Sequence, residues 1–165
     1  MRILRYSLLL ILALILQTTW VPAVAVFGIQ PELVLLALVM IGLAAGPFEA
    51  TLFGFGIGLI QDAYMPDNFG LNALVNSIIG FTVGWGRVRI VAESFYVQVV
   101  LVVGATLVQG LLVLIGDSQK GWGEIPFFWV RYILWNALYN GAVMALLGGF
   151  LLLRRRLFAP QAHEY

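Results

Sequence analysis

The sequence has no cysteine and a single histidine, His163. The absence of cysteine excludes disulfides, thiolate catalysis and cysteine-ligated metals, and one histidine leaves no cluster for a metal site or a catalytic triad. Charged residues are also scarce, at 10% of the chain, against roughly a quarter in soluble domains. Because so few polar groups cannot cover a surface that faces water, the composition predicts an integral membrane protein.

Hydrophobic residues make up 62% of the 165 residues. A membrane-spanning helix needs about 20 predominantly apolar residues, so the chain has room for five or six such helices. We predict an all-α protein with a single transmembrane domain over residues 1–165. Its six spans are expected near residues 6–27, 32–45, 48–64, 71–85, 94–115 and 127–153.

The first apolar segment has a second interpretation. It starts with Arg2 and Arg5 and contains the triplet Ala23-Val24-Ala25, a pattern that is also typical of a secretory signal peptide. The apolar run continues past the triplet, and Trp20 suits a membrane interface, which favours a span. Cleavage at the triplet would remove one span without moving the others.

Basic residues cluster near the ends of the predicted spans. With six spans, one side receives Arg2, Arg5, Arg87, Arg89 and Arg154–Arg156, whereas Lys120 lies in a loop on the other side. Because basic residues accumulate in cytoplasmic loops, we expect both termini in the cytoplasm. The basic residues do not form a continuous face, so no nucleic-acid partner is expected.

Residues 54–84 are predicted to form a helical hairpin around a polar turn. Residues four apart lie on one face of a helix, and this spacing produces two rows of glycine and polar residues. The rows are Gly54, Gly58 and Asp62 in the first segment and Asn72, Asn76, Gly80 and Gly84 in the second. Small residues at this spacing allow close helix packing in membranes, and Gly141 in the last span is expected to do the same.

Polar side chains from three segments are predicted at a similar depth near the outer side. They are Gln61, Asp62, Asn72, Asn76, Arg131 and Asn136. One interpretation is a polar cavity that they line together, open to the outer side. The other is that Asp62 caps the hairpin while Arg131 extends to the headgroups. The sequence leaves both open.

No catalytic set accompanies these side chains. Glu49 and Asp62 are expected on opposite sides of the membrane, so they cannot share a proton as a paired acid and base would. We expect no enzyme activity, no metal site and no cofactor.

The stretch from Gly58 to Leu74 resembles the MreD family of rod shape-determining proteins. That family has six spans and a pattern of Gly-Leu-x-x-Asp, a short turn and Gly-x-x-Ala-Leu. The matching residues here are Gly58, Leu59, Asp62, Gly70, Ala73 and Leu74, with further similarity at Gln17 and at Pro31–Leu33.

The resemblance implies a non-enzymatic scaffold or regulatory subunit of the Rod complex, which carries out peptidoglycan synthesis during cell-wall elongation and maintains rod shape. The implied location is the bacterial cytoplasmic (inner) membrane, and the implied direct partner is MreC. Through MreC the chain would act with MreB, RodA and RodA's transpeptidase partner. We expect the apolar faces of spans one, two and five to hold MreC, and the Asp62 cluster to shape the hairpin or bind a small molecule or lipid headgroup.

The resemblance also implies a fold similar to the substrate-binding S-components of energy-coupling-factor vitamin transporters. An S-component is therefore the alternative function. Such proteins use an Ala-x-x-x-Ala contact in span one, whereas here Ala13 is followed by Gln17. This difference disfavours the alternative.

Overall fold

The computed structural model describes residues 1–64, 68–87, 95–116 and 127–158. Within these ranges the protein is all-α, as predicted from the sequence, with six α-helices and one short 3₁₀ helix, η1. The elements are α1 (Arg2–Thr19), η1 (Val21–Val24), α2 (Leu33–Ala45), α3 (Pro47–Ala63), α4 (Leu71–Gly86), α5 (Phe95–Gly116) and α6 (Phe127–Phe158).

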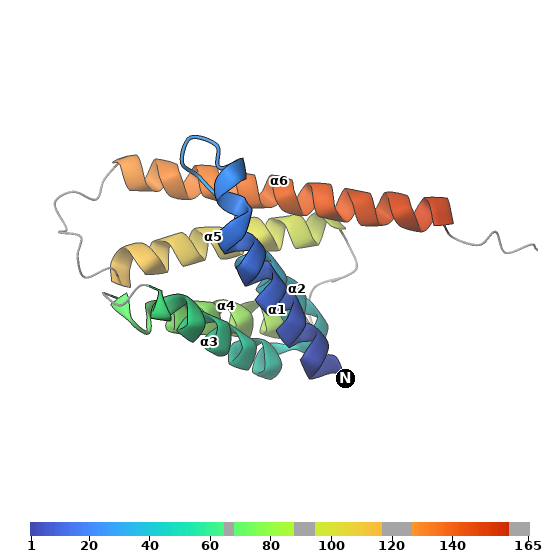
Figure 1. Cartoon of the computed structure of the whole chain (residues 1–165), viewed down its shortest axis with the longest axis horizontal. Helices are drawn as coiled ribbons and strands as arrows, with labels where there is room; N and C mark the ends of the chain where they lie inside the picture. Colours follow the sequence, from blue (N-terminus) through green and yellow to red (C-terminus); the bar gives the residue numbers. More distant parts are fainter. Residues whose placement is uncertain (65–67, 88–94, 117–126, 159–165) are drawn as a thin grey trace, which may run out of the picture.

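The helices are arranged in layers (Figure 1). Helices α5 and α6 run side by side along one side of the molecule, and the hairpin of α3 and α4 forms the opposite side. Helix α2 packs against α4 and α5, while α1 crosses obliquely and makes its main helix contact with α2. The last helix is therefore separated from the hairpin by the helices between them.

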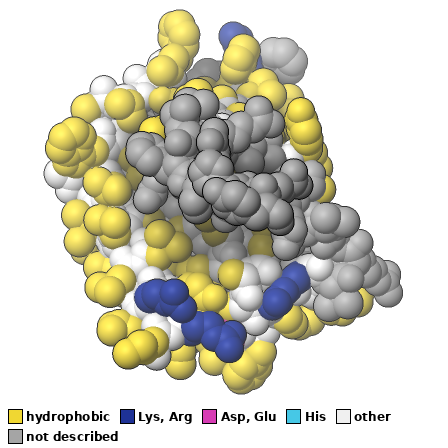
Figure 2. Space-filling view, turned by 90° about the vertical axis from the view of Figure 1, so that its right-hand side faces the viewer, with side chains coloured by type: hydrophobic (Ala, Val, Ile, Leu, Met, Phe, Trp, Pro, Cys, Tyr) yellow, Lys and Arg dark blue, Asp and Glu magenta, His cyan; other side chains and the backbone are white. Residues whose placement is uncertain are grey.

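The helix ends gather at two ends of the molecule. The turn between α3 and α4 lies at the same end as the start of α6, and the N terminus lies at the other end (Figure 1). Figure 2 looks onto that other end and shows Lys and Arg side chains over its lower part. Arg87, whose guanidinium lies near Gly46 at the junction of α2 and α3, belongs to this end.

Three described helices are long and apolar enough to cross a membrane. They are Arg2–Thr19, Tyr96–Gly116 and Arg131–Phe150, and Leu33–Ala45 is a shorter apolar helix. Helices α3 and α4, with 17 and 16 residues, are shorter than the approximately 20 residues of a typical span. The chain is a polytopic membrane protein, and crossing by all six helices stays a prediction.

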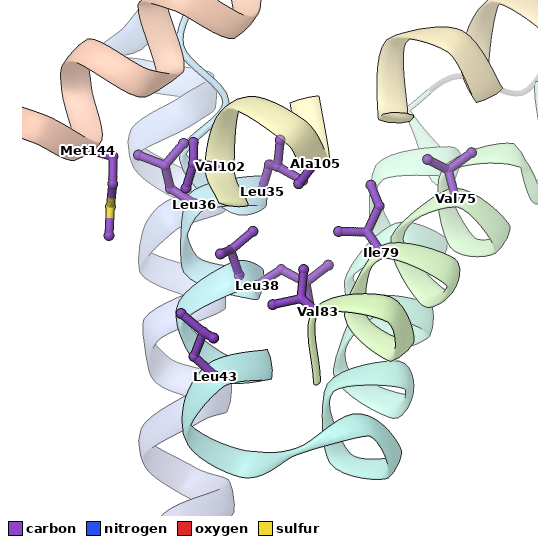
Figure 3. Close-up of a cluster of buried hydrophobic side chains, with 11 residues drawn as sticks. Leu35, Leu36, Leu38, Leu43, Val75, Ile79, Val83, Val102, Ala105 and Met144 are labelled. Carbon is purple, nitrogen blue, oxygen red and sulfur yellow. The ribbon is translucent and has the colours of Figure 1, made fainter. Parts of the chain in front are cut away.

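The core surrounds α2, as Figure 3 shows. Leu35, Leu38 and Val39 of α2 are at most 1% exposed, and side chains from α4, α5 and α6 pack into the same cluster. These partners are Val75, Ile79, Val83, Val102, Ala105 and Met144. Nine of the 13 residues of α2 are buried, and this burial on most sides explains its nearly continuous apolar sequence.

The first helix ends earlier than the sequence pattern indicated. Helix α1 stops at Thr19, and η1 and a two-residue turn follow, in place of a helix that continues to residue 27. Pro22 cannot donate a backbone hydrogen bond, so a regular helix is not continued through it. Phe27 and Gly28 have φ values of 52° and 79°, and positive φ at both central residues is what a tight type I′ turn requires.

Candidate functional site

Helices α3 and α4 touch through their backbones along the predicted glycine rows. A Cβ atom built at any of four glycines would collide with the backbone of the facing helix or of the residue that precedes it. Gly54 faces Asn76, Gly58 faces Asn72 and Ala73, Gly80 faces Ala50, and Gly84 faces Gly46 and Pro47. This seam holds the two helices at a fixed separation and brings their polar residues together.

Asp62 caps helix α4 from the neighbouring helix. Its Oδ1 accepts hydrogen bonds from the Asn72 backbone N–H, at 3.0 Å, and from Asn72 Nδ2, at 2.9 Å. Its Oδ2 accepts from the Ala73 N–H at 3.0 Å. The first N–H groups of a helix have no partner within the helix, and the N-cap residue Gly70 has no side chain to offer them. The fully buried Asp62 carboxylate takes that role, and the helix dipole favours its negative charge there.

A second interhelical bond lies one turn farther along the seam. Asn76 Nδ2 donates to Gln61 Oε1 at 2.7 Å, and Asn76 is 2% exposed. A buried amide without a partner costs free energy, so this bond satisfies two groups that the apolar surroundings would otherwise penalise. Gln61, Asp62, Asn72 and Asn76 therefore form two neighbouring hydrogen-bonded pairs, together called the hairpin cluster.

Another polar cluster, the Glu32 cluster, surrounds the start of α2. The Glu32 N–H donates to Asn140 Oδ1 at 2.7 Å, and the Val34 N–H donates to Gln17 Oε1 at 3.0 Å. Glu32, the N-cap residue, makes no side-chain cap of its own. Helix α2 is thus capped by side chains from α1 and α6, just as α4 is capped by a side chain from α3.

The Glu32 cluster extends from α2 to α5 and α6. Glu32 Oε1 accepts from Asn136 Nδ2 at 3.3 Å, and the side chain of Gln109 also hydrogen-bonds this carboxylate. Asn140 Nδ2 donates to Thr106 Oγ1 and to Asn136 Oδ1, at 3.1 Å in each case. Because α6 otherwise packs mainly on α5, these bonds tie both helices to the start of α2.

An apolar groove lies beside the Glu32 cluster, between α6 and the turn that precedes α2. Its volume is about 620 Å³, and its walls are Val26, Phe27, Ile29, Arg131, Tyr132, Trp135, Leu138 and Tyr139. The Tyr139 hydroxyl donates to the Val24 carbonyl at 2.7 Å and so fixes the turn against the helix. Ligand pockets commonly have volumes of about 300–1,000 Å³, so this groove, here called the outer groove, has the size of a binding site.

The structure distributes the six predicted pocket residues among three places. Four form the hairpin cluster, Asn136 belongs to the Glu32 cluster, and Arg131 lines the outer groove. Asp62 and Arg131 lie toward the same end of the molecule, but Asp62 is bonded to N–H donors and not to Arg131. Gly141, the fifth predicted packing glycine, faces Val103 of α5.

Five residues of the Glu32 cluster were not among the predicted site residues: Gln17, Glu32, Thr106, Gln109 and Asn140. The sequence did contain a signal, because Gln17 and Pro31–Leu33 were two of the similarities to the MreD pattern. In space they meet, since Gln17 bonds the Val34 N–H at the first turn of α2. Two acidic residues therefore stand in polar clusters, one at each of the two capped helix starts.

The described side chains do not offer a pair of acids for catalysis. Glu49 lies in the first turn of α3 and Asp62 in its last turn, about 20 Å apart along the helix at 1.5 Å per residue. Asp62 and Glu32 accept hydrogen bonds from amide donors, which is an arrangement that fixes helix ends. Within the described ranges no group of three or more His, Asp or Glu side chains could hold a metal ion.

Comparison with protein-family models matches residues 1–155 to a family described as rod shape-determining protein MreD. The match covers both capped helix starts and the outer groove. Searches of curated proteins and of solved structures gave no match.

Proposed function

The chain belongs to the MreD family of rod shape-determining proteins, and from that premise we propose that it is the membrane scaffold of a bacterial Rod complex. Membership gives it a role as a non-enzymatic determinant of rod shape. The finer assignment is direct binding to MreC in the cytoplasmic membrane, with MreB, RodA and RodA's transpeptidase partner reached through MreC.

The exposed apolar face of α1 is the observation that carries this proposal. Leu4, Leu8 and Leu12 lie four residues apart and are 64%, 57% and 54% exposed. Only 11% of the α1 span is buried inside the protein. Helix α1 therefore lies at the edge of the bundle, where a partner's membrane helix has access to it and packs by van der Waals contact.

Helix α5 offers a second exposed face, but α2 does not. Val100, Leu111 and Ile115 of α5 are 68%, 50% and 66% exposed. The expectation that span two also holds the partner is not supported, because nine of the 13 residues of α2 are buried, in a core shared with α4, α5 and α6 (Figure 3). The proposed contact with MreC uses α1 and α5.

The hairpin cluster is proposed to keep α3 and α4 in the shape that the scaffold requires. Both oxygens of Asp62 are occupied by α4, and the Gln61 amide oxygen is occupied by Asn76. These bonds support a structural role in preference to a headgroup-binding role for the cluster.

The alternative proposal is an S-component that binds a vitamin or similar nutrient, with the corresponding similarity of fold. The outer groove favours it, since its volume of about 620 Å³ falls in the range of small-molecule sites, about 300–1,000 Å³. Its walls are mostly apolar side chains. Such walls suit a vitamin with few polar groups, but they suit a lipid chain equally well. We give the scaffold precedence because of the family match.

Affinity capture from native membranes in a gentle detergent, with mass spectrometry of the bound proteins, tests the assignment. The scaffold role predicts recovery of MreC together with wall-elongation enzymes. The double variant Leu8→Ala/Leu12→Ala should reduce MreC recovery, and Phe55→Ala, an exposed apolar residue on α3, is the matched control. Capture of an ATPase pair with a coupling membrane subunit, and no MreC, would contradict the scaffold and establish the transporter.

A further inference from the structure

The outer groove combines an apolar wall with one cation at its rim. Arg131 is exposed and lies one turn inside the start of α6, where a long basic side chain can extend along the helix to the lipid headgroups. Trp135 and Leu138, which are 53% and 59% exposed, follow one and two turns farther into the helix. Residues at this spacing share one face of a helix, and the groove runs along that face.

The Arg131 guanidinium makes no ion pair with an acidic side chain among the described residues. Glu32 does not line the groove, and its carboxylate accepts hydrogen bonds from Asn136 and Gln109. Arg2, Arg5 and Arg87 lie toward the opposite end of the protein. A guanidinium in this setting is a donor for an anion, and its planar fork suits phosphate oxygens.

We propose that the outer groove holds one anionic glycerophospholipid. Its phosphate contacts Arg131, and one acyl chain lies along Trp135 and Leu138 beneath the turn at Phe27. The Tyr139 bond to Val24 keeps this turn over the helix, so the groove persists as a feature of the fold. The inference goes beyond the scaffold role and does not depend on it, because every wall of the groove belongs to this chain.

The dimensions of the groove suit a lipid chain. From Arg131 to Leu138 the groove extends about 10 Å along α6, and its volume is about 620 Å³. A single acyl chain fits within that volume, and the apolar residues Val26, Ile29 and Leu138 supply contacts of matching chemistry.

Native mass spectrometry of the full-length protein in detergent tests the proposal. Phosphatidylglycerol and phosphatidylcholine with identical acyl chains are added at equal concentration, and the bound fraction of each is measured. One cation near the headgroups predicts about a fivefold preference for phosphatidylglycerol. Arg131→Gln should abolish the preference, and Arg131→Lys should retain most of it.

Arg87→Gln is the matched control, since it removes an exposed arginine at the other end of the protein. It should leave the preference unchanged. Leu138→Trp should lower the binding of both lipids by filling the groove. Equal binding of the two lipids by the unchanged protein, or an equal loss with Arg87→Gln and Arg131→Gln, would overturn the proposal. A water-soluble adduct in place of lipid would also overturn it, and MreC capture is a separate measurement that none of these outcomes decides.

Discussion

At the scale of single residues, Asp62 is the clearest example of a charged group whose partners explain its place in a membrane protein. An ionised side chain in an apolar environment is costly unless it is paired or fully hydrogen-bonded. Asp62 is fully buried and accepts three hydrogen bonds from the first turn of α4. Its charge is stabilised by donors at a helix N-terminus, where no basic residue is needed.

Asp62→Ala is expected to lower the free energy of unfolding by about 2–4 kcal/mol, because it removes a helix cap and leaves buried N–H groups unpaired. Asp62→Asn keeps the shape but places an NH₂ group opposite an N–H donor, so its loss should be intermediate. Asn72→Ala removes only the side-chain bond and should cost about 1 kcal/mol. Thermal unfolding in detergent, followed by the fluorescence of the five tryptophans, measures the series. Equal stability of Asp62→Ala and Asn72→Ala would show that the backbone bonds do not contribute.

Residue spacing was sufficient to predict that Asp62 and Asn72 lie close together, because both belong to one hairpin and residues four apart share one face of a helix. It was not sufficient for Arg131 and Asn136. Similar depth in a membrane does not define lateral position, and α6 lies across the bundle from α3. Glu32 was treated only as the start of a span, although its backbone and carboxylate bond to side chains of α5 and α6, more than 70 residues later in the sequence.

At the scale of helices, the contact between α3 and α4 depends on the absence of side chains. Gly58 lies against the backbone of Asn72 and Ala73. Backbone atoms cannot turn aside as a flexible side chain can, so a methyl group there separates the helices. The hydrogen bonds of Asp62 to Asn72 and Ala73 lie at this same contact, so they would lengthen if the two helices moved apart.

Gly58→Ala is therefore expected to destabilise the protein by at least about 2 kcal/mol, through overpacking and lost hydrogen bonds. Gly56→Ala is the matched control in the same helix, because a Cβ atom there meets nothing within 4 Å. It should be neutral or stabilising by up to about 1 kcal/mol, since alanine favours helix over glycine. Unfolding by SDS titration measures both variants, and a neutral Gly58→Ala would mean that the two helices separate at little cost.

Helix ends were predicted best where glycine and proline mark them. Gly46 and Pro47 separate α2 from α3 at the expected place, with Gly46 at φ 99°. The end of α1 was placed too late, because an apolar composition continues through Pro22 to Phe27 although the helix does not. An apolar composition indicates that a segment lies in lipid. Whether the segment is helical depends on its backbone hydrogen bonds, which proline interrupts.

At the scale of the whole molecule, the two ends carry different polar groups. Arg2, Arg5 and Arg87 lie at one end, and the two capped helix starts lie toward the other. We propose that the arginine end faces the cytoplasm, in agreement with the general preference for basic residues there. Length and apolar composition single out three helices, so the paths of α2, α3 and α4 need a direct test.

The absence of cysteine makes this test simple, because any cysteine introduced is the only one. Gln30→Cys, in the exposed turn before α2, and Arg87→Cys, after α4, report on the two ends. In cells with a permeabilised outer envelope, a membrane-impermeant maleimide should label Gln30→Cys directly. Arg87→Cys should react only after the cytoplasmic membrane is opened. Labelling of both before that step would contradict the proposed orientation.

The caps described above also bear on the order in which the protein is made. Gln17 belongs to a helix synthesised before α2, and Asp62 belongs to a helix synthesised before α4. Each capped helix therefore emerges from the ribosome after the helix that carries its acceptor, so the Val34, Asn72 and Ala73 N–H groups can find their partners within a helix pair. Asn140 comes last in the chain, and its bond to the Glu32 N–H closes the start of α2 only when α6 arrives. We therefore expect the pairs α1–α2 and α3–α4 to form during synthesis, and the start of α2 to be completed only after α5 and α6 follow.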